Sequence, residues 1–174
     1  MYHLIITVKD FPSRFPKAYR TLSDSGLFTL HLRPTWKDLS GSEQETLFAA
    51  ADGLFWAADR LDAALLNRMP KLKLVSKMGS GMDNIDLDGC RTRGIAVVNS
   101  KGKNTNAVAE MTLCLMLALL RHLLPLSRAA REGAWDARVP GSELKGKTIG
   151  LIGFGMIARQ VAQLLSSFSV RICA

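Results

Sequence analysis

Three small residues near the carboxyl end of the chain have the spacing of a phosphate-binding turn. Gly153, Gly155 and Ala158 form a Gly-x-Gly-x-x-Ala pattern, preceded by an apolar run at residues 147–152 and followed by apolar residues at helical spacing. In a strand–turn–helix unit of this kind, the first glycine permits a sharp turn and the second lets backbone amides approach a pyrophosphate. The pattern predicts a dinucleotide-binding site at the helix amino terminus. The alternative is a glycine-rich turn without a ligand.

The acidic residue that would complete such a site is absent. It is expected about 20 positions further on, where it accepts hydrogen bonds from the ribose hydroxyls. No Asp or Glu follows Glu143, and residues 170–174 have the pattern of a second strand cut at its tip. NAD and NADP are therefore not distinguished. We expect the 174 residues to begin a nucleotide-binding domain that they do not complete.

The composition narrows the class of protein. Hydrophobic residues make up 48% and charged residues 22%, which is ordinary for an α/β protein. The net charge of +8 comes from scattered Lys and Arg, which favours a solvated surface over a nucleic-acid site. Residues 111–120 are the most apolar segment, but a run of this length cannot cross a bilayer, so we expect a buried helix and no membrane partner.

The three cysteines lack CxxC spacing, and two of them lie in apolar runs. Such a pattern is typical of buried thiols in a reducing compartment. We therefore expect a cytoplasmic protein without a bound metal.

The elements that must position the glycine turn follow a βαβ pattern. Over the first hundred residues, short apolar runs alternate with helical stretches, which is typical of a parallel sheet. We expect strands at residues 4–8, 28–32, 53–56, 72–77 and 95–99, with helices at 15–25, 42–51, 62–69 and 86–93. Ser42 and Glu45 have the spacing of a capping box at one helix start.

A long helical run begins at Asn104. Pro125 should kink it or divide it in two. Between Val108 and Leu120 its apolar residues cover nearly the whole circumference, so more than one neighbour must bury it. A second copy of the chain is one such neighbour, and we therefore expect a homodimer.

Four sequence blocks, taken in order, resemble the D-isomer-specific 2-hydroxyacid dehydrogenases, the family that includes phosphoglycerate dehydrogenase. They are MGSGMDNID at residues 78–86 with RGIAVVN at 93–99, GKNTNAVAE at 102–110, and LKGKTIG at 144–150 followed by the glycine fingerprint. The resemblance implies an α/β protein with a flavodoxin-like parallel-sheet substrate domain over residues 1–101, lacking its carboxy-terminal return. Over residues 102–174 it implies an interdomain helix and the first βαβ part of a Rossmann NAD-binding domain.

The resemblance also implies where the substrate binds. Ser80, Gly81 and Met82 match a loop whose backbone amides hold the substrate carboxylate, which is sound because a glycine-rich loop after a strand directs several N–H groups at one anion. Here the alternative is a simple turn ending at residues 83–84, which read as turn and cap residues. Asn104 matches a position that faces substrate and nicotinamide, and its alternative role is a helix N-cap.

The cofactor contacts carried over by the resemblance fall on two segments. Val108 would lie beside the nicotinamide ring, and the pyrophosphate would be bound by Gly153, Gly155, Met156 and Ile157.

No catalytic residue is implied within this chain. The family's carbonyl-orienting arginine, its acid/base histidine and the glutamate that tunes it fall beyond residue 174, and His3, His31 and His122 match none of these motifs. Without an acid/base group, the proton transfer that accompanies hydride transfer is missing. We expect the amino-terminal part of an oxidoreductase acting with NAD or NADP on a 2-hydroxy or 2-keto acid, inactive as this chain alone. The alternative is a non-catalytic nucleotide-responsive or dimerising protein of the same fold.

Overall fold

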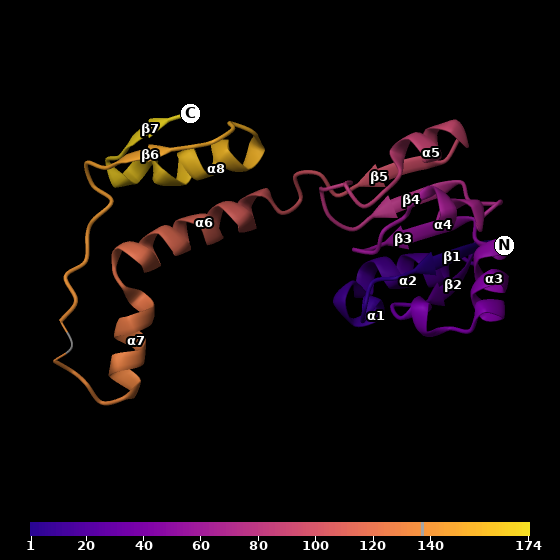
Figure 1. Ribbon diagram of the computed structural model, residues 1–174, viewed down its shortest axis with the longest axis horizontal. Helices are drawn as coiled ribbons and strands as arrows, with labels where there is room; N and C mark the ends of the chain where they lie inside the picture. Colours follow the sequence, from indigo (N-terminus) through magenta and orange to yellow (C-terminus); the bar gives the residue numbers. More distant parts are fainter. Residues whose placement is uncertain (137) are drawn as a thin grey trace. The chain divides into compact units, whose positions relative to one another are not determined.

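The computed structural model describes residues 1–136 and 138–174 and divides into two compact units, Met1–Lys101 and Gly102–Ala174 (Figure 1). The first unit is built on a five-stranded sheet in which every neighbouring pair is parallel. The strands are β1 (Tyr2–Ile6), β2 (Phe28–Leu32), β3 (Gly53–Trp56), β4 (Leu74–Lys77) and β5 (Ala96–Asn99). Their order, β2-β1-β3-β4-β5, is that of flavodoxin-like sheets, which confirms the predicted fold class.

The strand limits differ from the predicted ones where buried residues lie just outside the sheet. β2 and β3 have the predicted limits, whereas β1 covers Tyr2–Ile6 and β4 and β5 begin later than predicted. Val8, Leu72 and Ile95 are apolar because they are buried in connecting loops, and not because they belong to strands.

Helices cover both faces of this sheet, because alternate strand residues point to opposite faces (Figure 1). Ile5, Leu54 and Val75 point to one face and pack in the main core, with residues from η1 (Trp36–Asp38), α3 (Gly41–Ala50), α4 (Ala63–Asn67) and α5 (Leu87–Thr92). Ile6 and Phe55 point to the other face, toward α1 (Phe11–Arg14) and α2 (Pro16–Asp24). The helix predicted at residues 15–25 is thus shorter, at Pro16–Asp24, and the separate short helix α1 precedes it.

The capping box of α3 lies two residues earlier than predicted. Ser40 is the N-cap: its hydroxyl oxygen accepts from the Glu43 amide at 3.4 Å, and the Glu43 carboxylate accepts from the Ser40 amide at 2.9 Å. The predicted pair of Ser42 and Glu45 is therefore wrong. Ser42 and Glu45 have the same spacing as Ser40 and Glu43. The Glu45 carboxylate, however, accepts a hydrogen bond from the guanidinium of Arg68 at 2.9 Å.

The second unit contains a strand–helix–strand unit packed on a long helix. Its elements are α6 (Thr105–Leu120), α7 (Leu123–Arg131), β6 (Thr148–Gly150), α8 (Met156–Leu165), η2 (Ser166–Phe168) and β7 (Arg171–Cys173). β6 and β7 are parallel, with Ile149 opposite Ile172. The buried residues of this unit are Ala109, Leu144, Val161 and Leu165.

The long helical run divides before Pro125, and not at it as predicted. α6 ends at Leu120, and His122 adopts a left-handed conformation (φ 51°) that starts α7. Pro125 lies in the first turn of α7, where a backbone amide would have no helical acceptor and its loss costs little. No single helix of residues 1–136 and 138–174 meets the length and apolarity of a membrane span; α6 and α7 meet them only together, bent by 65°.

The helix predicted at residues 111–120 is present within α6, but the described residues cover only one side of it. Only Ala109 of α6 is buried. Met111, Leu115 and Leu119 are 58%, 56% and 74% exposed, and their spacing places them in one stripe. One side of α6 packs against α8, whereas this stripe is uncovered by the described residues.

The cysteines also depart from expectation. Cys90 is buried in the main core, but Cys114 and Cys173 are exposed. Apolar neighbours in the sequence therefore did not indicate burial in the second unit.

Candidate functional site

In the loop at residues 79–82, which follows β4, three of the four carbonyl oxygens accept hydrogen bonds, whereas the amide N–H groups donate to no described protein acceptor. The carbonyl oxygens of Gly79, Ser80 and Met82 accept from the Ser100 amide (3.0 Å), the Asn99 side-chain amide (2.7 Å) and the Ile85 amide (2.9 Å). Within the described residues, the four N–H groups of residues 79–82 donate to no protein acceptor. Gly79 has a φ of +112°, a conformation that favours glycine. Successive free amides in such a turn form an anion-binding concavity.

The side chains of this loop point to different environments. Met82 packs partly against the main core, whereas Ser80 and Gly81 are exposed. The carboxylate of Asp83 lies beside the loop, since a Cβ atom on Gly81 would be 3.6 Å from its Oδ2. The three residues predicted to bind substrate are thus contiguous, and what they offer together is backbone N–H groups.

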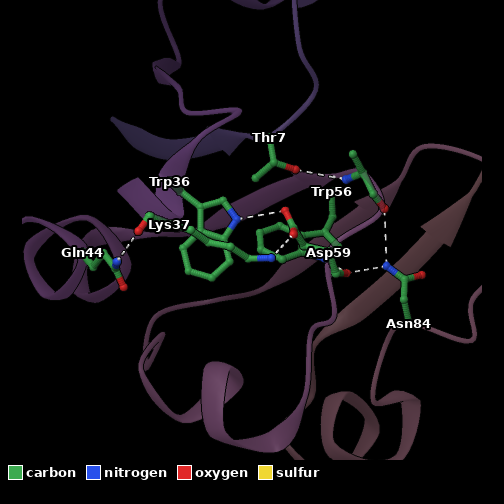
Figure 2. A network of polar contacts seen from close by, with 8 residues as sticks. Thr7, Trp36, Lys37, Gln44, Trp56, Asp59 and Asn84 are labelled. Carbon is green, nitrogen blue, oxygen red and sulfur yellow. Dashed lines mark hydrogen bonds and ion pairs between the residues drawn. The ribbon is translucent and has the colours of Figure 1, made fainter. Parts of the chain in front are cut away.

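Asn84 connects this loop to the loop that follows β3 (Figure 2). Its side-chain amide donates to the carbonyl oxygens of Asp59 at 2.5 Å and Ala57 at 3.4 Å, and its own carbonyl accepts from the Leu61 amide at 2.7 Å. The Ala57 amide in turn donates to the hydroxyl of Thr7, after β1, at 3.0 Å. Asn84 is therefore a link between loops at the carboxyl edge of the sheet, and not a helix cap.

Asp59 is the centre of this network (Figure 2). Its carboxylate accepts from the indole N–H of Trp36 at 3.1 Å and from the ammonium of Lys37 at 2.5 Å. Its carbonyl accepts from the indole N–H of Trp56 at 2.7 Å. No spacing in the sequence associates Asp59 with Trp36 and Lys37, because these residues meet it only through the packing of η1 on the sheet.

The histidines of the first unit lie away from the loop at residues 79–82. His3 Nδ1 and His31 Nε2 are 3.0 Å apart, joining β1 to β2. β1 and β3 separate β2 from β4, and His3 lies at the beginning of its strand, where its amide donates to Asp52. Burial lowers the pKa of His31, and the charges of His3 and Arg33 lower it further. This pair therefore offers no acid/base group to the loop.

The glycine fingerprint of the second unit forms the predicted strand–turn–helix structure. Gly153 has a φ of +83°, and Gly155 is the N-cap of the ten-residue helix α8 without a side-chain capping bond. A Cβ atom on either glycine would have no neighbour within 4 Å. A cavity of about 580 Å³ adjoins this turn, lined among others by Gly153, Gly155, Met156, Ile157, Thr112 and Met116. The free amides of the first turn of α8 give this end of the helix the capacity to bind a phosphate.

The other two predicted contacts lie at the start of α6. Asn104 occupies the N-cap position, but its side chain makes no capping hydrogen bond and is exposed. Val108 is half-buried and is not part of the cavity lining. The start of α6 is joined to the fingerprint helix through Asn106, whose side-chain oxygen accepts from Gln160 of α8 at 3.3 Å.

A metal site is not formed by the described residues, among which no group of three or more His, Cys, Asp or Glu side chains could hold an ion. The described residues thus offer two sets of free backbone amides, one in each unit, as candidate anion sites.

The sequence is similar to known dehydrogenases over most of its length. The family model of the D-isomer specific 2-hydroxyacid dehydrogenase catalytic domain matches residues 15–170. A glyoxylate reductase of Thermofilum pendens is 40% identical over 144 residues, covering 78% of this chain and 42% of that protein. A D-3-phosphoglycerate dehydrogenase of Mycobacterium tuberculosis is 38% identical over 144 residues, covering 80% and 27%.

The fold agrees with a solved structure. The NAD-dependent formate dehydrogenase from Staphylococcus aureus in complex with NAD superposes with a TM-score of 0.79 at 25% identity, covering 99% of this chain and 55% of that one. The chain spans less than half the length of the two curated relatives and about half of the solved one. It belongs to the D-isomer specific 2-hydroxyacid dehydrogenase family.

Proposed function

We propose that this chain forms the substrate-binding unit and the first part of the dinucleotide-binding unit of an oxidoreductase that transfers hydride between NAD or NADP and a 2-hydroxy or 2-keto acid. The observation that carries the proposal is the loop at residues 79–82, whose four amides are free while the carbonyls of Gly79, Ser80 and Met82 are occupied. Family membership supplies the reaction class. The relatives, a glyoxylate reductase and a D-3-phosphoglycerate dehydrogenase, are named for acid substrates, which supports an acid substrate here.

In this proposal the substrate carboxylate accepts hydrogen bonds from the amides of Ser80, Gly81 and Met82. The links through Asn84 and Asp59 hold the loop in place, so that little conformational entropy is lost on binding. The family resemblance adds Asn104 as a substrate contact, and its side chain makes no capping bond that would compete with this role.

The second unit fits a dinucleotide. The open space in front of Gly153 and Gly155 admits a pyrophosphate, and the amides of Met156 and Ile157 begin the helix that would bind it. Val108 would lie beside the nicotinamide. The bound dinucleotide supplies the hydride acceptor or donor; the S. aureus formate dehydrogenase was solved with NAD.

We also infer that the chain alone does not turn over substrate. The two histidines of the first unit hydrogen-bond to one another, and the described residues of that unit place no histidine at the loop. In this proposal the family's acid/base histidine has no counterpart in the first unit, so the proton transfer lacks its usual donor or acceptor. Incubation with NADH and glyoxylate or hydroxypyruvate should give no loss of absorbance at 340 nm, and turnover above the background rate would refute this inference.

Binding of a carboxylate tests the site itself. Glycolate should shift the amide NMR signals of residues 79–82 saturably, and neutral ethylene glycol should not. Gly79→Ala strains a φ of +112° and should abolish these shifts. Gly94→Ala strains a comparable φ of +67° at the end of α5 and is the matched control, which should bind glycolate normally. Equal losses in both variants would show that strain acts through the stability of the fold, and normal binding by Gly79→Ala would show that the loop conformation is not needed.

A homodimer through α6 is part of the proposal, and the exposed stripe of Met111, Leu115 and Leu119 supports it. Sedimentation should show a dimer that Leu115→Lys dissociates. Leu27→Lys is the control, because Leu27 is also 56% exposed but lies in the first unit. A monomeric wild-type chain would contradict the dimer, and a dimer that does not bind glycolate would favour the alternative of a dimerising protein without catalytic function.

A further inference from the structure

Lys77, the last residue of β4, carries a buried positive charge. The residue is 9% exposed. It follows Val75 on the face of the sheet that packs in the main core, and its strand neighbours are Trp56 of β3 and Asn99 of β5. Within the described part of the chain, no carboxylate lies within 4.0 Å of its ammonium nitrogen. Burying an ammonium without a counter-ion costs free energy, which indicates that the charge has a function.

The ammonium lies directly at the start of the loop with free amides. Its Nζ donates to the carbonyl of Met78 at 2.9 Å. A Cβ atom placed on Gly79 would lie 3.9 Å from it. An ammonium has three N–H donors, and the structure occupies one of them with a protein acceptor. The remaining N–H donors of Lys77 therefore lie close to the free amides of residues 79–82.

We propose that Lys77 is an anion-binding residue whose ammonium supplies the positive charge for the substrate carboxylate at the loop of residues 79–82. The inference rests on the proposed function and deepens it, since amides alone contribute dipoles whereas Lys77 contributes a full charge in a partly desolvated position. The carboxylate of Asp83, beside Gly81, acts in the opposite direction by repelling the anion. The site thus favours small monocarboxylates over their neutral analogues.

Two substitutions separate charge from structure. Lys77→Met removes the ammonium and keeps an unbranched apolar stem, so it also removes the cost of burying an unpaired charge. Lys77→Gln keeps a neutral donor for the Met78 carbonyl. If Lys77 served only to hold the loop, Lys77→Met would lower the urea midpoint and Lys77→Gln would behave as wild type. If its charge binds the anion, both variants fold with an unchanged or higher midpoint and both lose affinity.

The test is a glycolate titration of the 174-residue chain, followed through the amide NMR signals of residues 79–82. Both Lys77 variants should raise the dissociation constant about tenfold or more, and Asp83→Asn should lower it. Wild-type binding of glycolate with equal binding by Lys77→Met overturns this inference and leaves the proposed function standing. A lower midpoint in Lys77→Met with normal binding by Lys77→Gln also overturns it. Absence of binding in the wild type overturns both.

Discussion

Asp59 should contribute to stability mainly as a hydrogen-bond acceptor and only slightly as a charge. Asp59→Ala leaves the indole N–H of Trp36, a residue 7% exposed, without its acceptor. An unsatisfied buried donor costs about 1–3 kcal/mol. The ion pair with Lys37 adds at most about 1 kcal/mol, because the Lys37 side chain is 62% exposed. The backbone contacts of residue 59 remain in the variant. We expect the free energy of unfolding to fall by about 1–4 kcal/mol.

Two further variants test that division. Asp59→Asn keeps a carbonyl oxygen for Trp36 and loses only the charge, so it should cost less than about 1 kcal/mol. Lys37→Met removes the same ion pair from the other side and should cost a similar amount. Urea unfolding followed by tryptophan emission suits this comparison. Trp36 and Trp56 are buried in the first unit, whereas Trp135 is 86% exposed and contributes little change.

The decisive quantity is the shift of the urea midpoint at constant slope. The reasoning predicts that Asp59→Ala shifts it substantially more than Asp59→Asn. If the two variants lose equal stability, or if Lys37→Met loses as much as Asp59→Ala, the charge and not the acceptor is what matters. Either result would refute the assignment of Asp59 as the acceptor that holds η1 against the sheet.

Four further outcomes are expected. Ser40→Ala should lower the free energy of unfolding by about 0.5–2 kcal/mol, whereas Ser42→Ala should stay within about 0.5 kcal/mol in the same urea titration. Because His31 has a lowered pKa when folded, the unfolded chain binds its proton first; stability should fall as the pH drops below 6.5, and His31→Asn should flatten that dependence in pH-dependent unfolding. Burial raises the pKa of the Cys90 thiol, so an aromatic disulfide reagent should label only the two exposed cysteines until the protein is unfolded. NADH should bind weakly or not at all by calorimetry, since no acidic residue follows Glu143, and a submicromolar dissociation constant would contradict this.

The sequence predicted the features that depend on local pattern. Alternating apolar residues identified five strands and their parallel class, and the flanks of Gly153 identified the turn before α8. Strand ends were misplaced at Val8 and Leu72, because burial in a loop and burial in a strand look alike in a sequence. The break at His122 was missed because its left-handed backbone carries no glycine signal.

The candidate site was likewise predicted only in part. The loop at residues 79–82 was found from its glycines and from the family resemblance. The contacts that hold it were not found, because the Asn84 side-chain amide donates to the main-chain carbonyl of Asp59, and the two loops that carry these residues meet only through packing. Lys77 was also missed, since an isolated lysine at a strand end is ordinarily a surface residue, and only its burial marks it as different.

Recognition of an acid by the main chain has an evolutionary consequence. In the proposed function, the donors at Ser80, Gly81 and Met82 are present whatever side chains those positions carry, and only proline would delete one. The hydrogen bonds to the carboxylate are then retained in evolution together with the backbone conformation of the loop. Side chains other than Lys77 and Asp83 are free to change with the rest of the substrate, so one loop can serve enzymes for different 2-hydroxy acids without rebuilding the part that holds the acid.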